Sequence, residues 1–387
     1  MLTLAVGGGR VRTAEVIQRA IQDGGDNLDV RTLDAIELGR SWFRHLYTAH
    51  YAEALRYVLR RWRRLFPREK RSRQGTVPDW VFRRGCGEVF RRLRDVPPHL
   101  VIATETGAAE IAALGKREGW FNCPILAVQT ELEIAPALVE REIDVYAVVS
   151  EDARAQLIAW GVSPNRVVLC GFPIDPAFSL PFDEADVLQA LGLDARRPVV
   201  LVMGGGFGPA SLDEIILHLE RCVLPLQVVA VCGQDGAQKV RLESRRGRIA
   251  LDLHVFGWTD MVPELMAAAD LLIAKPGGVT TAEALTVGLP MIMTPSMPGS
   301  EERHLRHLEH HGAAVRVHSP EEIPQLVEQL LSDRERLAQM ARHARELGRP
   351  DAAHAVAQVG RALLETASYI EFLAAPPTRS GESAYLM

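Results

Sequence analysis

The sequence predicts an α/β protein with two Rossmann-like domains that face a cleft, and three observations support this. The chain has 387 residues and is 47 % hydrophobic, which exceeds the ~100–200 residues of one domain and is enough for two cores. An apolar run, a glycine turn and a helical pattern open the chain and recur near residue 198. Apolar runs alternate with helical patterns in both halves, as in parallel sheets covered by helices.

In the first half, residues 1–6 predict a buried strand, 7–9 a glycine turn, and 13–24 a helix that stops at Gly24. Another helix is expected at 151–161. Further strands are expected within four apolar runs bounded by turn residues: 99–107, 123–130, 144–150 and 166–176.

The second half repeats the pattern. Helices are expected at 212–222 and 261–269, and strand-and-turn units at 197–209, 226–236, 249–260, 270–278 and 289–299. We therefore expect a first domain over 1–177 and a second over 187–345. Residues 346–387 would form a carboxy-terminal helix, which could pack back on the first domain, and a loose tail.

Several classes of protein are disfavoured by composition. No stretch approaches the ~18 uninterrupted apolar residues of a spanning helix, and no signal peptide is recognisable, so a cytoplasmic protein is expected. The five cysteines lack a CxxC pair, which argues against a disulfide framework or a structural zinc site.

Positive charge is concentrated in residues 41–95, which hold 15 Lys and Arg against 5 Asp and Glu, although the net charge of the whole chain is −5. Aromatic residues are interleaved with the arginines, which suggests a helix lying on an anionic membrane surface. Packing on its own domain is the alternative, and nucleic acid is a weaker one. The residues expected at the membrane are Trp42, Phe43, Arg60, Arg61, Trp62, Arg63 and Arg64.

A second feature is the stretch AKPGGVTTAEALTVGLP at 274–290. A buried strand ends before Gly277 and Gly278, and Thr280 or Thr281 could cap the helix that follows. The unpaired first-turn amides and Lys275 favour a phosphate, and Glu283 could accept hydrogen bonds from ribose hydroxyls. An ordinary strand-to-helix loop is the alternative. The glycine turns at 7–9 and 204–206 match neither GxGxxG nor a Walker loop.

Residues 274–315 resemble the donor-binding region of the bacterial diacylglycerol glycosyltransferases and the monogalactosyldiacylglycerol synthases, relatives of the peptidoglycan glycosyltransferase MurG. The stretches VVSEDARAQLIAWGVSPNRVVLCGFPIDPAF, VMGGGFG and VFGWTDMVPELMAAADLLI extend the resemblance. It is colinear over residues 1–345, specific in the carboxy-terminal half and looser in the amino-terminal half.

The resemblance implies a GT-B glycosyltransferase with a UDP-sugar in the second domain and a lipid acceptor in the first. It places the uracil at Gly257, Trp258 and Met261, the diphosphate at Gly277, Gly278, Thr280 and Thr281, and the ribose at Glu283. Glu301 and Glu302 would face the sugar, and Gly205 and Gly206 would line the cleft. The chain has no D-x-D triplet, so helix amides and Lys275 would stabilise the leaving diphosphate and neither a metal nor a cofactor is expected.

The chain departs from the family at the first glycine turn, Gly8-Gly9-Arg10, where relatives have histidine after the glycines. A guanidinium cannot accept a proton at physiological pH. Glu131 and then Glu105, each after a buried strand and a threonine, are the candidate catalytic bases. The alternative is that both are solvated loop residues. If Gln at each of the two positions leaves turnover unchanged, His45, His50 and His99 are the next candidates.

The function expected is inverting transfer of a hexose from a UDP-sugar to diacylglycerol or a similar lipid, at the inner face of the cell membrane. The expected partners are the UDP-sugar, the lipid and an anionic membrane surface, and nucleic acid is not among them. A UDP-sugar transferase or epimerase with a soluble substrate is the first alternative. A catalytically silent protein that binds sugar nucleotide or membrane is the second.

Overall fold

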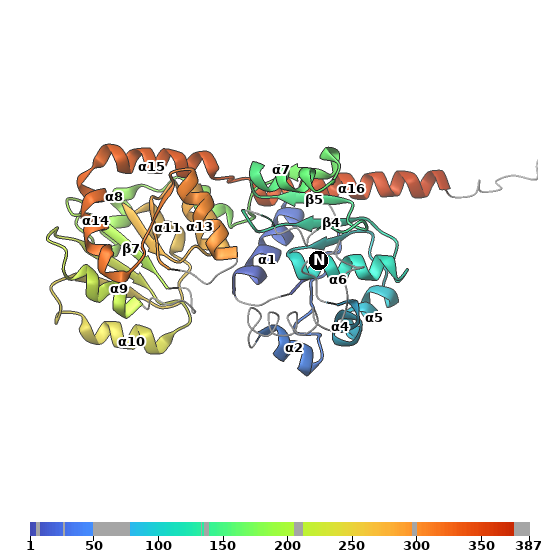
Figure 1. The fold of residues 1–387 in the computed structure, drawn as a ribbon, viewed down its shortest axis with the longest axis horizontal. Helices are drawn as coiled ribbons and strands as arrows, with labels where there is room; N and C mark the ends of the chain where they lie inside the picture. The colour runs from blue at the N-terminus through green and yellow to red at the C-terminus, as the bar shows by residue number, and fades with distance from the viewer. Residues whose placement is uncertain are drawn as a thin grey trace, which may run out of the picture.

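The computed structural model describes residues 1–4, 8–25, 28–48, 78–132, 134, 139–204, 212–295 and 300–374. Two lobes lie side by side, each a parallel sheet with helices on both faces (Figure 1). The predicted fold class is therefore confirmed. Among the described residues, no helix has the length and apolar character needed to cross a membrane.

The first sheet has six parallel strands in the order β2-β1-β3-β4-β5-β6. Its strands are β1 (Leu2–Thr3), β2 (Leu33–Asp34), β3 (Val101–Ala103), β4 (Ile125–Val128), β5 (Val145–Val148) and β6 (Val167–Leu169). The α-helices of this lobe are α1 (Gly8–Asp23), α2 (Ser41–Thr48), α4 (Asp79–Gly85), α5 (Gly87–Asp95), α6 (Thr106–Arg117) and α7 (Glu151–Ala159). The strand order reverses between β1 and β3.

The second sheet has the order β12-β11-β10-β7-β8-β9, also entirely parallel. Its strands are β7 (Val199–Met203), β8 (Gln227–Val231), β9 (Asp252–Phe256), β10 (Leu271–Ala274), β11 (Met291–Met293) and β12 (Ala314–Arg316). The helices that follow η3 (Pro176–Ser179) are α8 (Glu184–Leu191), α9 (Leu212–Leu219), α10 (Gly236–Arg245), α11 (Val262–Ala267), α12 (Gly278–Val287), α13 (Ser300–His310), α14 (Ile323–Ser332) and α15 (Arg334–Leu347). This is the Rossmann order, which reverses between β7 and β10. Ligands of such sheets bind beyond the strand ends at that point.

Burial on both faces explains why the strands read as continuous apolar runs. In β7, Val199 and Leu201 belong to the core on one face of the sheet, and Val200 and Val202 belong to the core on the other. The first sheet is covered in the same way, with α1 and α16 (Ala352–Ala374) over one face. All five cysteines are free, and four of them are buried.

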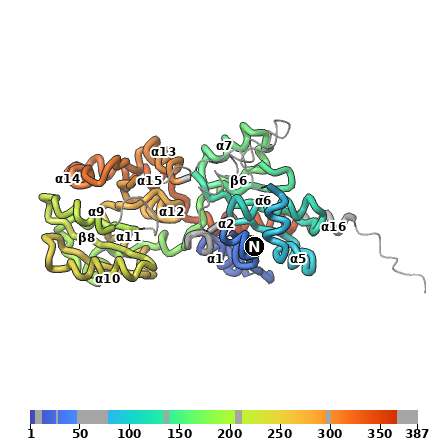
Figure 2. The backbone as a smooth tube through the Cα atoms, turned by 60° about the horizontal axis from the view of Figure 1, so that its bottom comes forward, coloured from blue at the N-terminus to red at the C-terminus, as the bar shows by residue number. Residues whose placement is uncertain are grey.

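Helix α16 returns to the first lobe at the end of the chain and packs against α1 (Figures 1 and 2). Arg361 donates a hydrogen bond to the carbonyl of Ile21 at 3.0 Å. The chain therefore passes twice between the lobes, after β6 and after α15, and its last described helix belongs with the first sheet.

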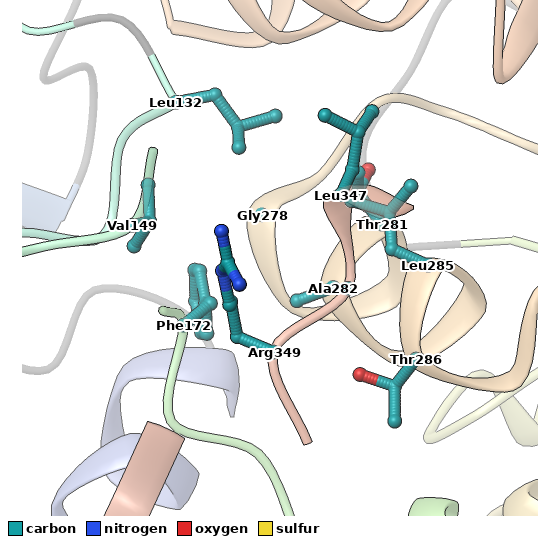
Figure 3. A pocket seen from close by; sticks show the side chains of 11 residues that line it. Leu132, Val149, Phe172, Gly278, Thr281, Ala282, Leu285, Thr286, Leu347 and Arg349 are labelled. Atoms are coloured by element: carbon teal, nitrogen blue, oxygen red, sulfur yellow. The ribbon is translucent and has the colours of Figure 1, made fainter. Parts of the chain in front are cut away.

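The two segments of chain that pass between the lobes are in contact with each other. Gly171 has φ +95°, and a Cβ there would lie 2.2 Å from Cβ of Arg349, so only glycine fits. Beside the crossing lies an apolar pocket with the Arg349 side chain pointing into it (Figure 3). It is lined by residues of both lobes, including Leu132, Val149, Phe172, Gly278, Thr281, Ala282 and Leu285.

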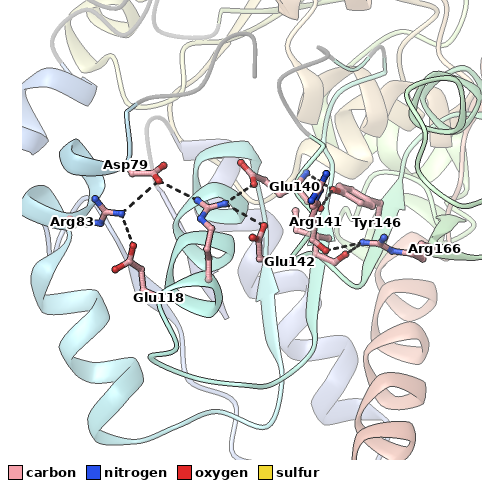
Figure 4. Close-up of polar contacts among 10 residues, drawn as sticks. Asp79, Arg83, Glu118, Glu140, Arg141, Glu142, Tyr146 and Arg166 are labelled. Atoms are coloured by element: carbon pink, nitrogen blue, oxygen red, sulfur yellow. Dashed lines mark hydrogen bonds and ion pairs between the residues drawn. The ribbon is translucent and has the colours of Figure 1, made fainter. Parts of the chain in front are cut away.

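A polar network braces the first lobe away from this junction (Figure 4). The Arg117 guanidinium lies 3.1 Å from a carboxylate oxygen of Glu140, 3.4 Å from one of Glu142 and 3.5 Å from one of Asp79. The Tyr146 hydroxyl donates to the Glu140 carbonyl at 3.0 Å, and burial raises the pKa of Tyr146 to about 12. These contacts join α4, α6 and β5, so we regard this network as structural.

Two predicted helix starts were wrong by several residues. Helix α1 begins at Gly8, so Gly8, Gly9 and Arg10 form its first turn where the sequence suggested a free glycine turn. Helix α12 begins at Gly278 with Gly277 as its N-cap, so Thr280 and Thr281 lie inside the helix and do not cap it. The N-cap of α12 is a glycine with no side-chain cap, which the sequence pattern did not predict.

Candidate active site

The predicted diphosphate-binding loop (the donor loop, residues 275–278) leaves the second sheet at the point where the strand order reverses. Lys275 follows the last residue of β10, Gly204 follows the end of β7, and the two strands are neighbours. The first amides of α12 precede its first intrahelical hydrogen bond, from the Thr281 N–H to the Gly277 carbonyl at 3.0 Å. They therefore offer donors and positive potential to an anion.

The start of α12 also touches the first lobe. A methyl group on Gly278 would lie 2.9 Å from the Phe172 ring, 3.4 Å from the Thr130 carbonyl oxygen and 3.4 Å from Cε1 of His304. The carboxyl end of β4 therefore meets the predicted phosphate-binding turn, and Glu131 is the next residue after Thr130.

Glu283 lies inside α12 and is only 4 % exposed. Burial raises its pKa to about 7, an effect that nearby Arg12 opposes and Asp175 reinforces. Arg12 comes from α1 and Asp175 from the crossing after β6, so Glu283 faces the junction of the two lobes. A buried carboxylate with so high a pKa is typical of a binding or catalytic site.

The two predicted sugar-facing glutamates point in different directions. Glu301 accepts a hydrogen bond from Lys275 Nζ at 2.8 Å, which holds it at the donor loop. Both carboxylate oxygens of Glu302 accept from Arg316, at 3.0 and 3.1 Å, and Arg316 also bonds Glu309. Consecutive helix residues lie about 100° apart around the axis, and in this structure the two carboxylates have different partners.

The predicted uracil residues follow β9 at the same edge of the sheet. Trp258 is 63 % exposed and Met261 is 39 % exposed, so both present apolar surface to solvent. Gly257 lies close to Lys239, whose Cδ would be 3.3 Å from an added Cβ. Gly205 and Gly206 lie outside the described residues.

Glu131 lies at the carboxyl end of β4 and reaches across to α13. Its Oε2 atom is 3.3 Å from Nε2 of His304 and 3.5 Å from a guanidinium nitrogen of Arg303, and its side chain is 19 % exposed. His304 is 3 % exposed, and its Nδ1 lies 3.3 Å from the Pro276 carbonyl oxygen. The alternative that Glu131 is a solvated loop residue is therefore wrong.

Glu105 follows β3 and is 6 % exposed, so it is not solvated either. Its carboxylate accepts a hydrogen bond from the Ala108 N–H at 3.2 Å and caps α6. This capping role was not predicted, and it makes Glu131 the better candidate for a base. His99 precedes β3 and so lies at the opposite end of the strands, His45 is exposed on α2, and His50 lies outside the described residues.

The structure divides the residues predicted at a membrane. Trp42 is 40 % exposed on α2, whereas Phe43 is fully buried. Phe43 packs edge-on against Phe82 with ring centroids 6.2 Å apart and lies against Gly85. Assigning Phe43 to the membrane was therefore wrong, because it belongs to the core of the first domain. Arg60, Arg61, Trp62, Arg63 and Arg64 lie outside the described residues.

Sequence reasoning missed a stripe of histidines on α13 and just after it. His304, His307 and His311 recur at intervals of three and four residues, a spacing that places them on one face of a helix and could have been recognised in the sequence. His307 Nδ1 lies 3.0 Å from a carboxylate oxygen of Asp152 on α7, and burial lowers the pKa of His307 to about 4. The stripe faces the first domain.

Comparison with known proteins agrees with this arrangement. Residues 11–174 match the family model for monogalactosyldiacylglycerol (MGDG) synthase, and residues 199–356 match that for the glycosyltransferase family 28 C-terminal domain. A processive diacylglycerol beta-glucosyltransferase of Bacillus cytotoxicus is 27 % identical over 92 % of this chain and 91 % of its own length. One from Bacillus pumilus is 29 % identical over 58 % of each chain, so that match spans little more than half of the relative.

Solved structures share the fold at low identity. MurG of Acinetobacter baumannii has a TM-score of 0.62 at 18 % identity, covering 93 % of this chain and 98 % of its own. HepE of Anabaena, solved in complex with UDP-glucose, has a TM-score of 0.53 at 17 % identity, covering 95 % and 99 %. In both of its domains the chain thus resembles the bacterial diacylglycerol glycosyltransferases and monogalactosyldiacylglycerol synthases, on a MurG-like GT-B fold.

Proposed function

We propose that this protein is a hexosyltransferase that moves a sugar from a UDP-sugar to the free hydroxyl of a diacylglycerol-type lipid, with inversion. The names of its relatives, the matches in both domains and the UDP-sugar in a structural neighbour support this. The proposal depends on one observation above all. The start of α12 lies against Thr130, so the phosphate-binding turn and the acidic end of β4 meet at one place.

Each residue at or near this meeting point would have a separate role in the reaction. The first amides of α12 and Lys275 would hold the diphosphate, and Glu283 would accept hydrogen bonds from the ribose. Glu131 would take the proton as the lipid oxygen attacks the anomeric carbon. The bond from that carbon to the diphosphate breaks, and the amides and Lys275 stabilise the leaving UDP without a metal ion at that position.

His304 and Arg303 would position Glu131 for this step. Both lie within 3.5 Å of its Oε2 atom and come from the helix that also carries Glu301. Residues of the second domain would therefore orient Glu131, which belongs to the first. Proton acceptance by Glu131 would then require contact between the two domains. Arg10 cannot replace it, because a guanidinium stays protonated.

The test measures UDP release and glycolipid formation with UDP-glucose, UDP-galactose or UDP-glucuronic acid and vesicles containing diacylglycerol. Glu131→Gln should lower kcat about 10²–10⁴-fold, as for loss of a general base, with UDP affinity nearly unchanged. Glu105→Gln is the matched control, because its amide oxygen can still cap α6 and turnover should persist. Near-normal turnover in Glu131→Gln would exclude Glu131 as the base. Donor conversion that needs no lipid would favour a soluble substrate or epimerisation.

We also propose that the enzyme works at the inner face of the cell membrane through its basic aromatic segment. The support is the charge pattern of residues 41–95, together with Trp42, which stands exposed on α2. The protein should sediment with anionic vesicles and be released by salt, since surface charges are screened beyond ~10 Å at 0.1 M ionic strength.

Replacing Arg60, Arg61, Arg63 and Arg64 with Gln should weaken this sedimentation and leave UDP affinity unchanged. The control replaces Arg245, Arg246 and Arg248 with Gln, a comparable basic stretch at the end of α10 in the other domain. Equal loss in the two variants would show that general charge, and not this segment, directs binding.

A further inference from the structure

Three potential metal ligands meet where the last turn of α13, in the second domain, faces α7 of the first. His307 lies in the last turn of α13, His311 lies one turn later, and Asp152 belongs to the first turn of α7. The Asp152 Oδ2 atom is 3.0 Å from His307 Nδ1 and 3.6 Å from His311 Nε2. One ligand atom from each residue lies within 4.8 Å of the others.

These distances suit a bound ion. A tetrahedral zinc ion with ligands at ~2.0–2.1 Å holds them ~3.3 Å apart, and the separations of 3.0 and 3.6 Å fall on either side of that value. The imidazoles are also not fully satisfied without a ligand. Nε2 of His311 is a buried atom with no hydrogen-bond partner among the described residues, and it faces the Asp152 carboxylate at 3.6 Å.

We propose that Asp152, His307 and His311 bind one divalent transition-metal ion, Zn²⁺ by preference, which ties α7 of the first domain to α13 of the second. Two imidazoles and one carboxylate are ligands that suit zinc. The side chains of Asp152 and His311 are 51 % and 36 % exposed, so the site lies near the surface, and a water molecule would supply the fourth ligand. Loss of such an ion would leave the domains joined by the rest of their contacts.

This ion would be separate from the donor site. Glu301, which bonds Lys275, stands at the start of α13, and a rise of ~1.5 Å per residue puts His307 ~9 Å further along the helix axis. The ion therefore would not contact the diphosphate. The experiments on zinc binding and on metal-independent UDP binding therefore test the two proposals independently, and either proposal can be wrong while the other holds.

The experiment uses the full chain, freed of metal by chelator and then dialysed. Calorimetric titration with Zn²⁺ should show one site per chain, and Co²⁺ should give the visible bands of a tetrahedral N/O site. Asp152→Ala and His311→Ala should each weaken Zn²⁺ binding at least ~10-fold, since even the loss of a residue that supports a ligand costs about that much. Both residues are partly exposed, so both variants should fold, and UDP binding will verify this.

His310→Ala is the matched control, because His310 is an exposed neighbouring imidazole outside the ligand set. It should keep Zn²⁺ affinity and Co²⁺ bands. Zn²⁺ should also raise the Tm of the wild type and of His310→Ala but not that of the two ligand variants. Absence of a stoichiometric site, or equal weakening in His310→Ala, would overturn the proposal. So would unchanged affinity in Asp152→Ala, because the ion would then not join the domains.

Discussion

Replacing Glu283 with Gln should stabilise the protein in the absence of ligand and weaken its binding of UDP. Glu283 is 4 % exposed, and burial raises the pKa of its carboxyl from 4.5 to about 7. The protonated form is therefore favoured in the folded state, and Gln imitates that form without a charge. A site that costs stability when empty is expected where a ligand supplies the missing hydrogen bonds.

The size of the effect follows from the two pKa values of Glu283, 4.5 and about 7. Each pKa unit corresponds to ~1.4 kcal/mol. The pKa of Glu283 is higher in the folded state than in the unfolded state. Glu283 therefore lowers the free energy of unfolding little below pH 4.5, and lowers it further as the pH rises toward 7. The free energy of unfolding of Glu283→Gln should exceed that of the wild type by ~3 kcal/mol at pH 8 and by less than ~1 kcal/mol at pH 5.

Urea unfolding of both proteins at the two pH values measures this difference directly. Glu365→Gln is the control, because Glu365 is exposed in the middle of α16, and it should match the wild type at both pH values. A gain in Glu283→Gln that is equal at pH 5 and pH 8 would refute the reasoning, because the effect would then not come from the charge.

Binding of UDP should show the opposite dependence. Ribose hydroxyls donate to an ionised carboxylate, so the affinity of the wild type for UDP should rise between pH 6 and pH 8. Calorimetry should show that Glu283→Gln loses ~1–3 kcal/mol of binding free energy at pH 8 and most of the pH dependence. Affinity equal to that of the wild type at pH 8 would remove Glu283 from the donor site.

Three further predictions concern single side chains. Phe43→Ala should lower the free energy of unfolding by ~3–5 kcal/mol, as for a fully buried aromatic, whereas Trp42→Ala, which changes an exposed neighbour, should cost far less by the same urea assay. Lys275→Met should weaken UDP binding by ~1.5–3 kcal/mol in calorimetry with excess chelator, and unchanged affinity would mean that its bond to Glu301 persists in the complex. Gly278→Ala should lower Tm and turnover because its methyl group would lie 2.9 Å from the Phe172 ring, while Gly277→Ala meets nothing closer than 3.8 Å and should be milder.

The repeating elements and the donor loop could be predicted from sequence because their signals are local. Apolar runs of four or five residues between turn residues identify buried parallel strands, and β7 and β10 lie within the predicted segments. The two glycines after β10 mark the turn at which we expect the second sheet to bind the diphosphate. Spacing alone could not give the helix starts at Gly8 and Gly278, because glycine has a low helix propensity and the N-cap of α12, Gly277, has no side chain to mark the start.

Only the tertiary structure distinguished residues whose sequence surroundings look alike. Trp42 and Phe43 sit in one basic aromatic run, yet one faces solvent and the other is buried against Phe82. Glu105 and Glu131 each follow a strand and a threonine, yet one caps its own helix and the other reaches His304 in the second domain. Adjacent helix residues point in different directions, and the partner of each is decided by what packs there.

The junction between the domains is the clearest case. Asp152 and His307 are 3.0 Å apart but lie on α7 and α13, in different domains. Periodicity places each residue on a helix, and a motif predicts where a phosphate would bind, because both are properties of a short stretch of chain. Which carboxylate meets which imidazole depends on how two separately folded sheets dock, and no local pattern contains that information.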